Sequence, residues 1–139
     1  MRRIGSHPLW LGHMGDAANS RQLLDAGIRA LVDLAAEQPP VSPPRELTYC
    51  RFPLQDGADN PHELIYLAVN TVSSLLSWGV TTLVCCGAGM SRSPAIAAAA
   101  LALWLNEPAD HCLAEVTSQG PADVSPGLWK SVSKLFPSR

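Results

Sequence analysis

The possible folds of this chain are limited most by a strand-like run, a glycine-rich turn and an apolar helix in direct succession. Residues 81–85 read Thr-Thr-Leu-Val-Cys, which predicts a buried strand because β-branched and apolar residues favour one. Residues 91–105 are apolar on nearly every side of a helix, which predicts a helix in the centre of a domain. Such a junction is typical of α/β proteins, whose ligands bind at the carboxyl ends of strands.

The rest of the sequence repeats this alternation of strands and helices. Further strands are predicted over residues 9–12, 28–35 and 48–54, and further helices over 19–26, 60–79, 108–117 and 127–136. Prolines interrupt residues 39–44, and residues 55–60 are polar and turn-rich, so both segments are predicted loops. We therefore expect one α/β domain over residues 1–139, with a central, mostly parallel sheet flanked by helices.

Composition and charge exclude several classes of partner. The formal net charge of −2 shows no basic surplus, so neither nucleic acid nor an anionic membrane surface is expected as a partner. The longest apolar stretch, residues 94–105, is too short to span a bilayer, and no apolar run follows the two N-terminal arginines, so no signal peptide is expected. The spacing of the four cysteines fits neither zinc knuckles nor a disulfide framework, which favours reduced thiols and a cytoplasmic protein. Oligomeric state leaves no signal in the sequence.

The turn between the predicted strand and helix has the features of an anion site. Gly87 and Gly89 allow a tight arc whose backbone N–H groups point inward, and such a nest binds phosphate. The helix adds the positive end of its dipole, and Arg92 can hold two phosphate oxygens with its planar fork. These three features favour the thiolate form of Cys86, which can then attack the phosphate held above it. The predicted phosphate-binding residues are Gly87, Ala88, Gly89, Met90, Ser91 and Arg92.

The sequence Cys-Gly-Ala-Gly-Met-Ser-Arg-Ser-Pro over residues 86–94 resembles the signature loop of the protein tyrosine phosphatases, in their dual-specificity branch. Weaker likenesses lie in residues 9–12, 24–34 and 125–129, so the resemblance covers nearly the whole chain. It implies a phosphatase-like fold and the hydrolysis of phosphomonoesters through a phosphocysteine, with no metal and no cofactor. Phosphotyrosine, phosphoserine or phosphothreonine in proteins are the foremost substrates by this resemblance, and lipid and nucleotide phosphates stay open.

The resemblance also implies roles for individual residues. Cys86 is the nucleophile and Arg92 the phosphate clamp, while Ser93 matches the hydroxyl that stabilises the leaving thiolate. The general acid of the family is an aspartate roughly 30 residues before the cysteine. Asp56 falls there and is the preferred candidate, with Asp59 in the same loop as its rival.

One residue departs from the family pattern. The position before the nucleophile is usually a histidine that orders the loop, and here it is Cys85. This change predicts weaker stabilisation of the thiolate, and it leaves open a phosphate-binding pseudophosphatase without turnover. It also suggests a redox hypothesis, in which Cys85 or Cys50 traps an oxidised Cys86 as a disulfide. A rhodanese-like sulfurtransferase is a third alternative, although it gives no reason for the Arg92-Ser93 pair.

Overall fold

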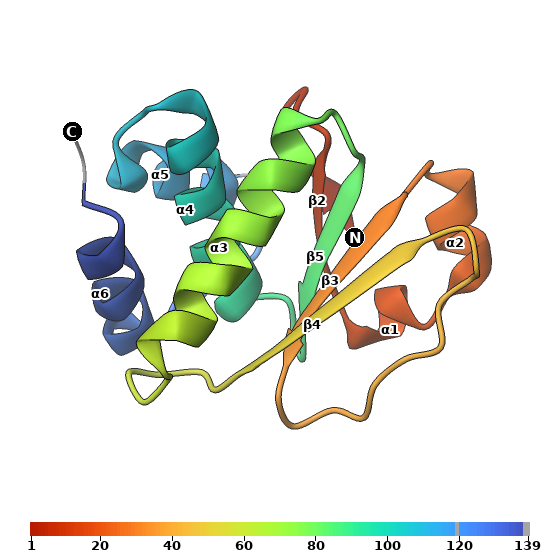
Figure 1. Ribbon diagram of the computed structural model, residues 1–139, viewed down its shortest axis with the longest axis horizontal. Helices are drawn as coiled ribbons and strands as arrows, with labels where there is room; N and C mark the ends of the chain where they lie inside the picture. The colour runs from red at the N-terminus through yellow and green to blue at the C-terminus, as the bar shows by residue number, and fades with distance from the viewer. Residues whose placement is uncertain (119, 138–139) are drawn as a thin grey trace.

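The computed structural model describes residues 1–118 and 120–137. In chain order its elements are β1 (Arg2–Arg3), β2 (Leu9–His13), α1 (Met14–Ala17), α2 (Ser20–Asp25), β3 (Ala30–Ala35), β4 (Thr48–Leu54), α3 (His62–Ser77), β5 (Thr82–Cys86), α4 (Arg92–Leu105), α5 (Ala109–Ser118) and α6 (Pro126–Leu135). The strands form one sheet in the order β1-β2-β5-β3-β4, in which β1 pairs with β2 antiparallel and the other neighbours are parallel (Figure 1). The prediction of a single α/β domain with a mostly parallel sheet is confirmed.

Helices cover both faces of the sheet. In Figure 1, α1 and α2 lie on one side of the strands, and α3 to α6 lie on the other. Side chains alternate between the two faces of a strand, so β5 contributes to two separate cores. Val84 and Cys86 join the larger core under α3 and α4, whereas Leu83 and Cys85 join the smaller core under α1 and α2.

Helix α4 occupies the centre of the larger layer, as its all-apolar sequence predicted. Its residues from Arg92 to Ala102 are buried, and it contacts α3, α5 and α6 as well as the sheet. Four consecutive alanines, residues 97–100, give it a narrow profile that allows these neighbours to pack closely. The first turn of this buried helix lies directly after the glycine-rich turn, so the helix fixes the position of that turn.

Most predicted boundaries agree with the structure within about two residues. Strand β3 starts at Ala30 rather than at residue 28, because Gly27 takes a left-handed φ of 76° and the Ile28 N–H still donates to the Leu23 carbonyl at the end of α2. Strand β5 extends one residue further than predicted and includes Cys86. The two short elements β1 and α1 were not predicted, because two and four residues are too few to show a periodic pattern.

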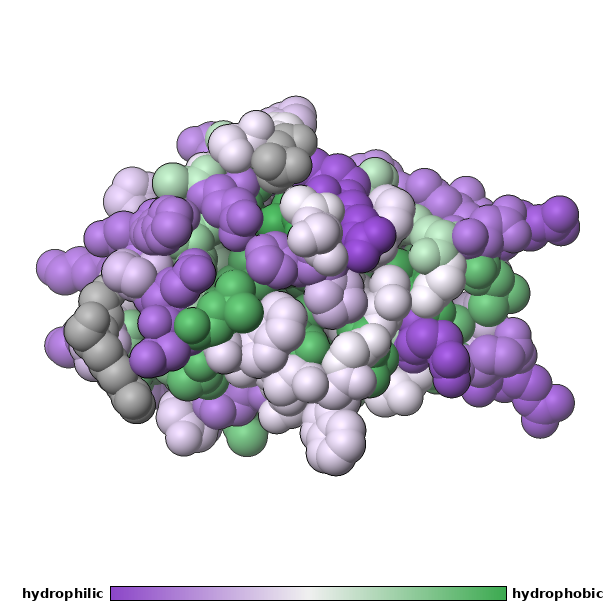
Figure 2. All heavy atoms as spheres, turned by 90° about the horizontal axis from the view of Figure 1, so that it is seen from above, coloured by the Kyte–Doolittle hydropathy of each residue, from purple (hydrophilic) through white to green (hydrophobic). Residues whose placement is uncertain are grey.

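The carboxyl ends of β2, β3, β4 and β5 meet at one edge of the sheet, the lower edge in Figure 1. The loops of residues 36–47, 55–61 and 87–91 all begin there. Figure 2 shows the molecule from above, turned by 90° from Figure 1, and hydrophobic residues appear on this face as separate green patches among polar ones. No helix within the described ranges is both long and apolar enough to cross a bilayer.

Candidate active site

Cys86 is the last residue of β5 and lies where the sheet meets the glycine-rich turn. It is 2% exposed and pairs in register with His13, the last residue of β2. Its side chain is on the face of the sheet that α4 covers, together with the larger core. The buried strand thus holds the sulfur in one position at the carboxyl edge.

The turn of residues 87–91 needs glycine at two positions for different reasons. Gly89 has a φ of 75°, and a Cβ built on it would lie 2.8 Å from the Gly12 carbonyl oxygen at the end of β2. A Cβ on Gly87 would lie 2.6 Å from Oε2 of Glu37 and 3.2 Å from Nη2 of Arg92. Glycine at position 89 thus lets the turn close against β2, and glycine at position 87 leaves room for the side chains of Glu37 and Arg92.

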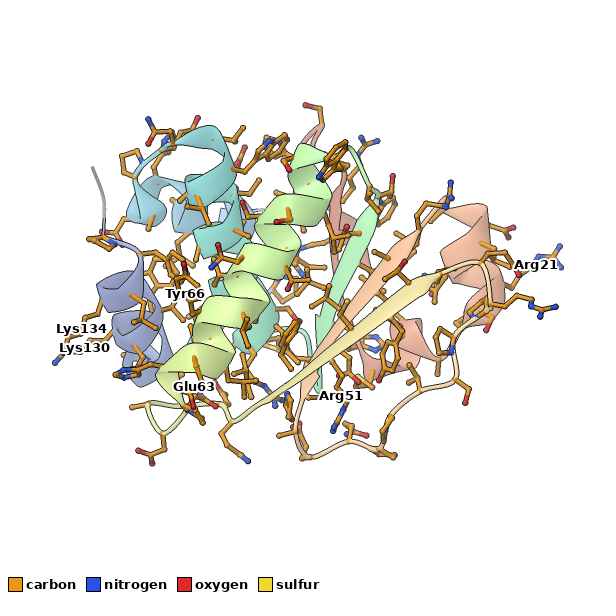
Figure 3. All side chains as sticks on the ribbon, in the orientation of Figure 1. Arg21, Arg51, Glu63, Tyr66, Lys130 and Lys134 are labelled. Carbon is orange, nitrogen blue, oxygen red and sulfur yellow. The ribbon has the colours of Figure 1, made fainter. Side chains whose placement is uncertain are left out.

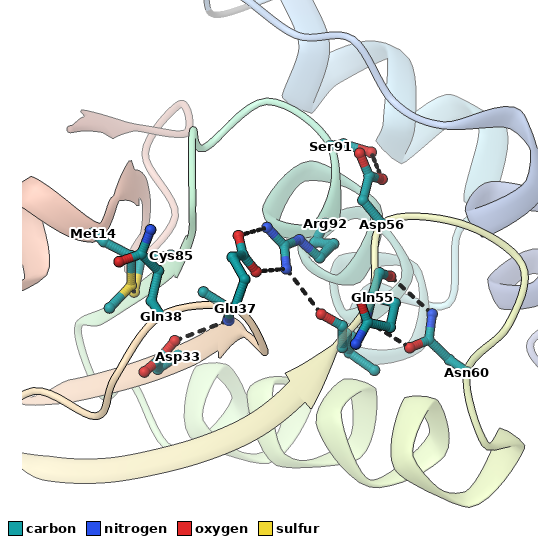
Figure 4. Close-up of polar contacts among 12 residues, drawn as sticks. Met14, Asp33, Glu37, Gln38, Gln55, Asp56, Asn60, Cys85, Ser91 and Arg92 are labelled. Atoms are coloured by element: carbon teal, nitrogen blue, oxygen red, sulfur yellow. Dashed lines mark hydrogen bonds and ion pairs between the residues drawn. The ribbon is translucent and has the colours of Figure 1, made fainter.

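Arg92, the first residue of α4, points its guanidinium towards Glu37 and β4. Its Nη1 donates to Oε1 of Glu37 at 2.6 Å and to the Leu54 carbonyl at 2.8 Å, and its Nη2 donates to Oε2 of Glu37 at 2.7 Å. Figure 4 shows this two-pronged ion pair beside the end of β4. Arg92 is only 7% exposed, whereas the Glu37 side chain is half exposed.

The ion pair shifts the pKa of both partners. The hydrogen bonds from Arg92 lower the pKa of Glu37 from 4.5 to about 2, against the opposing effect of burial. The hydrogen bond to Glu37 likewise raises the pKa of Arg92, and the nearby Cys86 and Asp56 add smaller contributions in the same direction. Both groups are therefore charged at neutral pH.

One edge of the Arg92 guanidinium has no partner among residues 1–118 and 120–137. A guanidinium has five N–H bonds, and Glu37 and Leu54 together take both on Nη1 and one on Nη2. The remaining two, on Nε and Nη2, lie on the same side of the planar group. A guanidinium edge of this kind has the geometry to hold two oxygens of a phosphate, and Glu37 orients Arg92 without occupying that edge.

Asp56 lies in the loop after β4 and reaches the glycine-rich turn. The Ser91 hydroxyl donates to Oδ1 of Asp56 at 2.6 Å, and the Ser91 hydroxyl oxygen accepts from the Ser125 N–H at 2.9 Å. Ser125 in turn caps the start of α6. These hydrogen bonds tie three segments that are far apart in the sequence to one another, and Figure 4 shows the one between Ser91 and Asp56.

Asn60 holds the loop that carries Asp56. Its buried side chain accepts from the Gln55 N–H at 2.7 Å and donates to the carbonyls of Gln55 and Gly57 at 2.9 and 3.2 Å. The loop is thus closed on itself by three hydrogen bonds to one amide. Asp59, the rival candidate in this loop, is exposed and does not line the pocket described next.

A small pocket of about 220 Å³ brings the predicted residues together. The described residues that line it are Asp56, Cys86, Ala88, Met90, Ser91, Arg92 and Asp123. It is smaller than most ligand pockets, which agrees with the limited room that a short chain leaves for pocket walls. Ser93 lies behind it, fully buried, and its hydroxyl has no hydrogen-bond partner within the described part of the chain.

Glu37 and Asp123 were missed by the sequence reasoning. Glu37 follows the carboxyl end of β3, the strand next to β5, and an acidic residue at that position could have been considered. Asp123 lies between α5 and α6, and nothing in its own neighbourhood of the sequence indicates that it meets the glycine-rich turn. Its place depends on how α6 packs on the rest of the domain.

A buried polar cluster anchors the loop that presents Glu37. Asp33 is fully buried, accepts from the Tyr49 hydroxyl at 2.8 Å and lies 3.6 Å from Nε of Arg51. Arg51 also donates to the carbonyls of Ala35 and Gln38, on either side of Glu37. Burial, and then the hydrogen bond to Asp33, raises the pKa of Tyr49 to about 12, so this hydroxyl stays a donor.

Cys85 is on the opposite face of β5 from Cys86. Its thiol packs in the smaller core, 3.8 Å from the sulfur of Met14, and burial raises its pKa far above that of a free thiol. Cys50 is two strands away from β5, at the level of Val84, which by strand spacing puts it roughly 12 Å from Cys86. A disulfide needs Cα atoms within about 7 Å, so this distance disfavours a disulfide between Cys50 and Cys86. The orientation of Cys85, on the other face of the strand, disfavours a disulfide between Cys85 and Cys86.

The four histidines give no indication of a metal site. His13 caps α1 and accepts from the Gly15 N–H, and His7 lies against Trp104 and Glu115. Within residues 1–118 and 120–137, no group of three or more His, Cys, Asp or Glu side chains is arranged to hold a metal ion.

Comparison with known proteins gives a clear likeness in structure. Human DUSP28 superposes with a TM-score of 0.86 at 25% identity, over 98% of this chain and 95% of that chain. A mouse putative dual-specificity phosphatase, solved in complex with zinc tungstate, gives a TM-score of 0.84 at 25% identity, over 96% and 84%. DUSP15, at 23% identity and a TM-score of 0.83 over 99% and 88%, shares the fold. No protein-family model and no curated protein matched the sequence.

The mostly parallel sheet, the cysteine at the end of its central strand and the arginine at the start of the buried helix define the class of protein: a phosphatase fold of the protein tyrosine phosphatase superfamily. Within that superfamily the likeness to DUSP28 and to the mouse protein, which extends over most of each chain, supports the dual-specificity branch. The resemblance seen in the signature loop is thereby confirmed.

Proposed function

We propose that this protein hydrolyses phosphomonoesters through a phosphocysteine on Cys86, with phosphorylated proteins as its substrates. The observation that carries the proposal is that one pocket gathers Cys86, the free edge of Arg92 and the carboxylate of Asp56. The first supplies a nucleophile, the second a phosphate clamp and the third a proton. Nothing in these roles requires a metal or an organic cofactor.

In the first step the Cys86 thiolate attacks phosphorus while the phosphoryl oxygens are held by Arg92 and the turn of residues 87–91. The S–P bond forms as the bond from phosphorus to the ester oxygen breaks. Asp56, oriented by the Ser91 hydroxyl, gives its proton to the departing oxygen. The glycine-rich turn and the start of α4 stabilise the negative charge that spreads over the phosphoryl oxygens.

In the second step water attacks the phosphocysteine. Asp56 takes a proton from the water, the S–P bond breaks and inorganic phosphate leaves with the Cys86 sulfur again a thiolate. Ser93 supports this step in our proposal, since a hydroxyl buried without a partner is costly and would be satisfied by donating to the sulfur. The buried position of Ser93 directly after Arg92 supports this assignment.

The test compares two neighbouring cysteines. Cys86→Ser should abolish hydrolysis of an aryl phosphate, whereas Cys85→Ser, a change on the other face of the same strand, should retain it. Rapid acid quenching followed by mass spectrometry should find one phosphoryl group on wild type, mapped to the peptide that contains Cys86. Equal activity of the two variants, or a phosphoryl group elsewhere, would refute the proposal.

A pseudophosphatase that binds phosphoproteins without turnover is the second candidate. It is favoured by Cys85, which replaces the usual histidine and points away from the site. Binding of a phosphopeptide with no release of phosphate would support it, and a thiosulfate assay separates both from a sulfurtransferase. We also propose that the protein works in the cytoplasm, because its four cysteines are free thiols and a thiolate nucleophile needs reducing conditions.

A further inference from the structure

Asp123 places a carboxylate at the mouth of the candidate active site. It lines the pocket together with Cys86, Arg92 and Asp56. Its backbone N–H donates to the Met90 carbonyl at 2.8 Å, so its segment is fixed to the glycine-rich turn. The hydrogen bond between Ser125 and Ser91, two residues further on, holds the other end of the same segment. Asp123 is therefore held in place by its backbone while its side chain stays exposed.

No cation of the described part of the chain pairs with the Asp123 carboxylate. It forms no hydrogen bond or ion pair with any residue of the described ranges 1–118 and 120–137. Lys130 and Lys134, on the nearby helix α6, point outwards from the molecule in Figure 3. Arg51, at the lower edge, is committed to Asp33 and to the loop that carries Glu37. These three cations therefore do not pair with Asp123, and Arg2, which lies beside Gly120, forms no ion pair with it among the described residues.

The charges around the pocket are unbalanced. Arg92 is the one cation among the described residues that line it, and Glu37 already pairs with Arg92. With Asp56 carrying the proton that it donates in the first step, the Cys86 thiolate and the Asp123 carboxylate still leave an excess of negative charge around the entrance. The phosphoryl group itself can still bind through backbone amides, the helix dipole and the free edge of Arg92. The rest of the substrate, which is attached to the ester oxygen, extends out of the pocket past this negative charge.

We infer that Asp123 makes the site selective for phosphopeptides with arginine or lysine beside the phosphorylated residue, and against peptides with acidic neighbours there. This inference rests on the proposed function and names the substrate class of that site. A pocket of this volume puts Asp123 within roughly 7 Å of a neighbouring side chain, where Coulomb's law in water gives roughly threefold attraction or repulsion. Between a basic and an acidic neighbour the preference is roughly five- to tenfold.

The same charges argue against polyanionic substrates. An inositol lipid with several phosphates, or a nucleotide with a phosphate chain, needs several cations around the reacting phosphate. The described residues that line this pocket supply Arg92 alone. Of the substrate classes that the sequence left open, phosphoproteins with basic neighbours fit the charges of the pocket best.

The test uses two phosphopeptides that differ only in arginine or glutamate next to the phosphorylated residue. We expect wild type to prefer the arginine peptide in kcat/KM by roughly five- to tenfold at low salt, and less as salt rises. The preference should shrink in Asp123→Asn, persist in Asp123→Glu and reverse in Asp123→Lys. The ratio is taken within each variant, so a general change in activity cancels. Asp25→Asn, the same charge change on the far side of the sheet, should leave the ratio unchanged.

Three outcomes would overturn the inference. They are equal use of the two peptides by wild type, a ratio unaffected by Asp123→Asn, and faster hydrolysis of an inositol trisphosphate lipid than of either peptide. If an aryl phosphate is not hydrolysed at all, the proposed function fails. The flank preference is then measured as binding of the two peptides to the intact protein by fluorescence anisotropy, and equal affinities would overturn it independently.

Discussion

Replacing Glu37 with glutamine separates two possible effects of its ion pair with Arg92. The carboxylate either holds the guanidinium in position for phosphate or competes with phosphate for it. Nη1 and Nη2 of Arg92 face Glu37, while Nε and the second hydrogen of Nη2 meet no acceptor in the described part of the chain, so the geometry favours positioning. We therefore expect Glu37→Gln to lose both activity and stability.

The size of the effect follows from the contacts. Glutamine keeps the size of the side chain and can accept one hydrogen bond from Arg92, but its amide nitrogen meets a second donor. A hydrogen bond to a charged group contributes about 1.5–3 kcal/mol, and the half-exposed position of Glu37 reduces this through solvent screening. We expect the free energy of unfolding to fall by about 1–2 kcal/mol, with a decrease in melting temperature of about 3–8 °C. A misplaced clamp should lower kcat/KM by about ten- to a hundredfold.

The pH dependence of stability gives an independent check. The pKa of Glu37 is lowered to about 2 in the folded protein, so its contribution is complete above its ordinary pKa near 4.5. It is lost as the pH falls from there towards 2. The difference between wild type and Glu37→Gln should thus be full near neutral pH and narrow below about pH 4.5. Urea unfolding at a series of pH values measures it.

Glu46→Gln is the matched control, because Glu46 is an exposed carboxylate in the same loop with no ion pair among the described residues. It should change neither activity nor stability. A rise in kcat/KM for Glu37→Gln would show that Glu37 competes with phosphate and would refute the positioning argument. Identical unfolding curves for wild type and Glu37→Gln at neutral pH would show that the pair contributes nothing to the fold.

Two further changes test the supports of the site. Asn60→Ala removes three hydrogen bonds that close its loop, and we expect the free energy of unfolding to fall by about 1–3 kcal/mol. Because the change displaces Asp56, hydrolysis of esters with poor leaving groups should fall more than hydrolysis of activated esters. Equal losses on both kinds of ester would argue against Asp56 as the acid. Gly89→Ala forces a Cβ at a φ of 75° to within 2.8 Å of the Gly12 carbonyl, which should cost about 2–4 kcal/mol and abolish turnover. Gly79→Ala, at a φ of 70° in open space, carries only the backbone strain, and thermal melts that rank the two variants equally would contradict the close approach.

Local patterns in the sequence were sufficient to propose a nucleophile and a phosphate clamp. Cys86 and Arg92 flank one short turn between a buried strand and a buried helix, and the apolar residues of both elements make them predictable from the sequence. The two residues are six positions apart, so their side chains have few possible relative positions once the ends of the turn are fixed. A phosphate-directed chemistry could therefore be inferred from the sequence. The sheet class followed from the alternation of strands and helices for the same reason.

The choice between Asp56 and Asp59 could not be made in this way. Both lie in one polar loop, and only the position of that loop relative to Ser91 puts Asp56 in the pocket and leaves Asp59 outside it. Cys85 likewise had a plausible redox role by adjacency to Cys86. The alternation of side chains across the strand, together with the packing of Met14, places it in another core.

The sequence by itself was enough to predict the class of chemistry, because the residues proposed to carry it lie within one short segment, residues 86–93. Tertiary structure alone decided what surrounds that turn: Glu37 reaches Arg92 across 55 positions of chain, and Asp123 meets Met90 through the packing of α6. Neither residue belongs to a periodic pattern or a motif. Their positions depend on how separate elements pack into one core, and contacts between distant segments leave no signal in the neighbourhood of either partner.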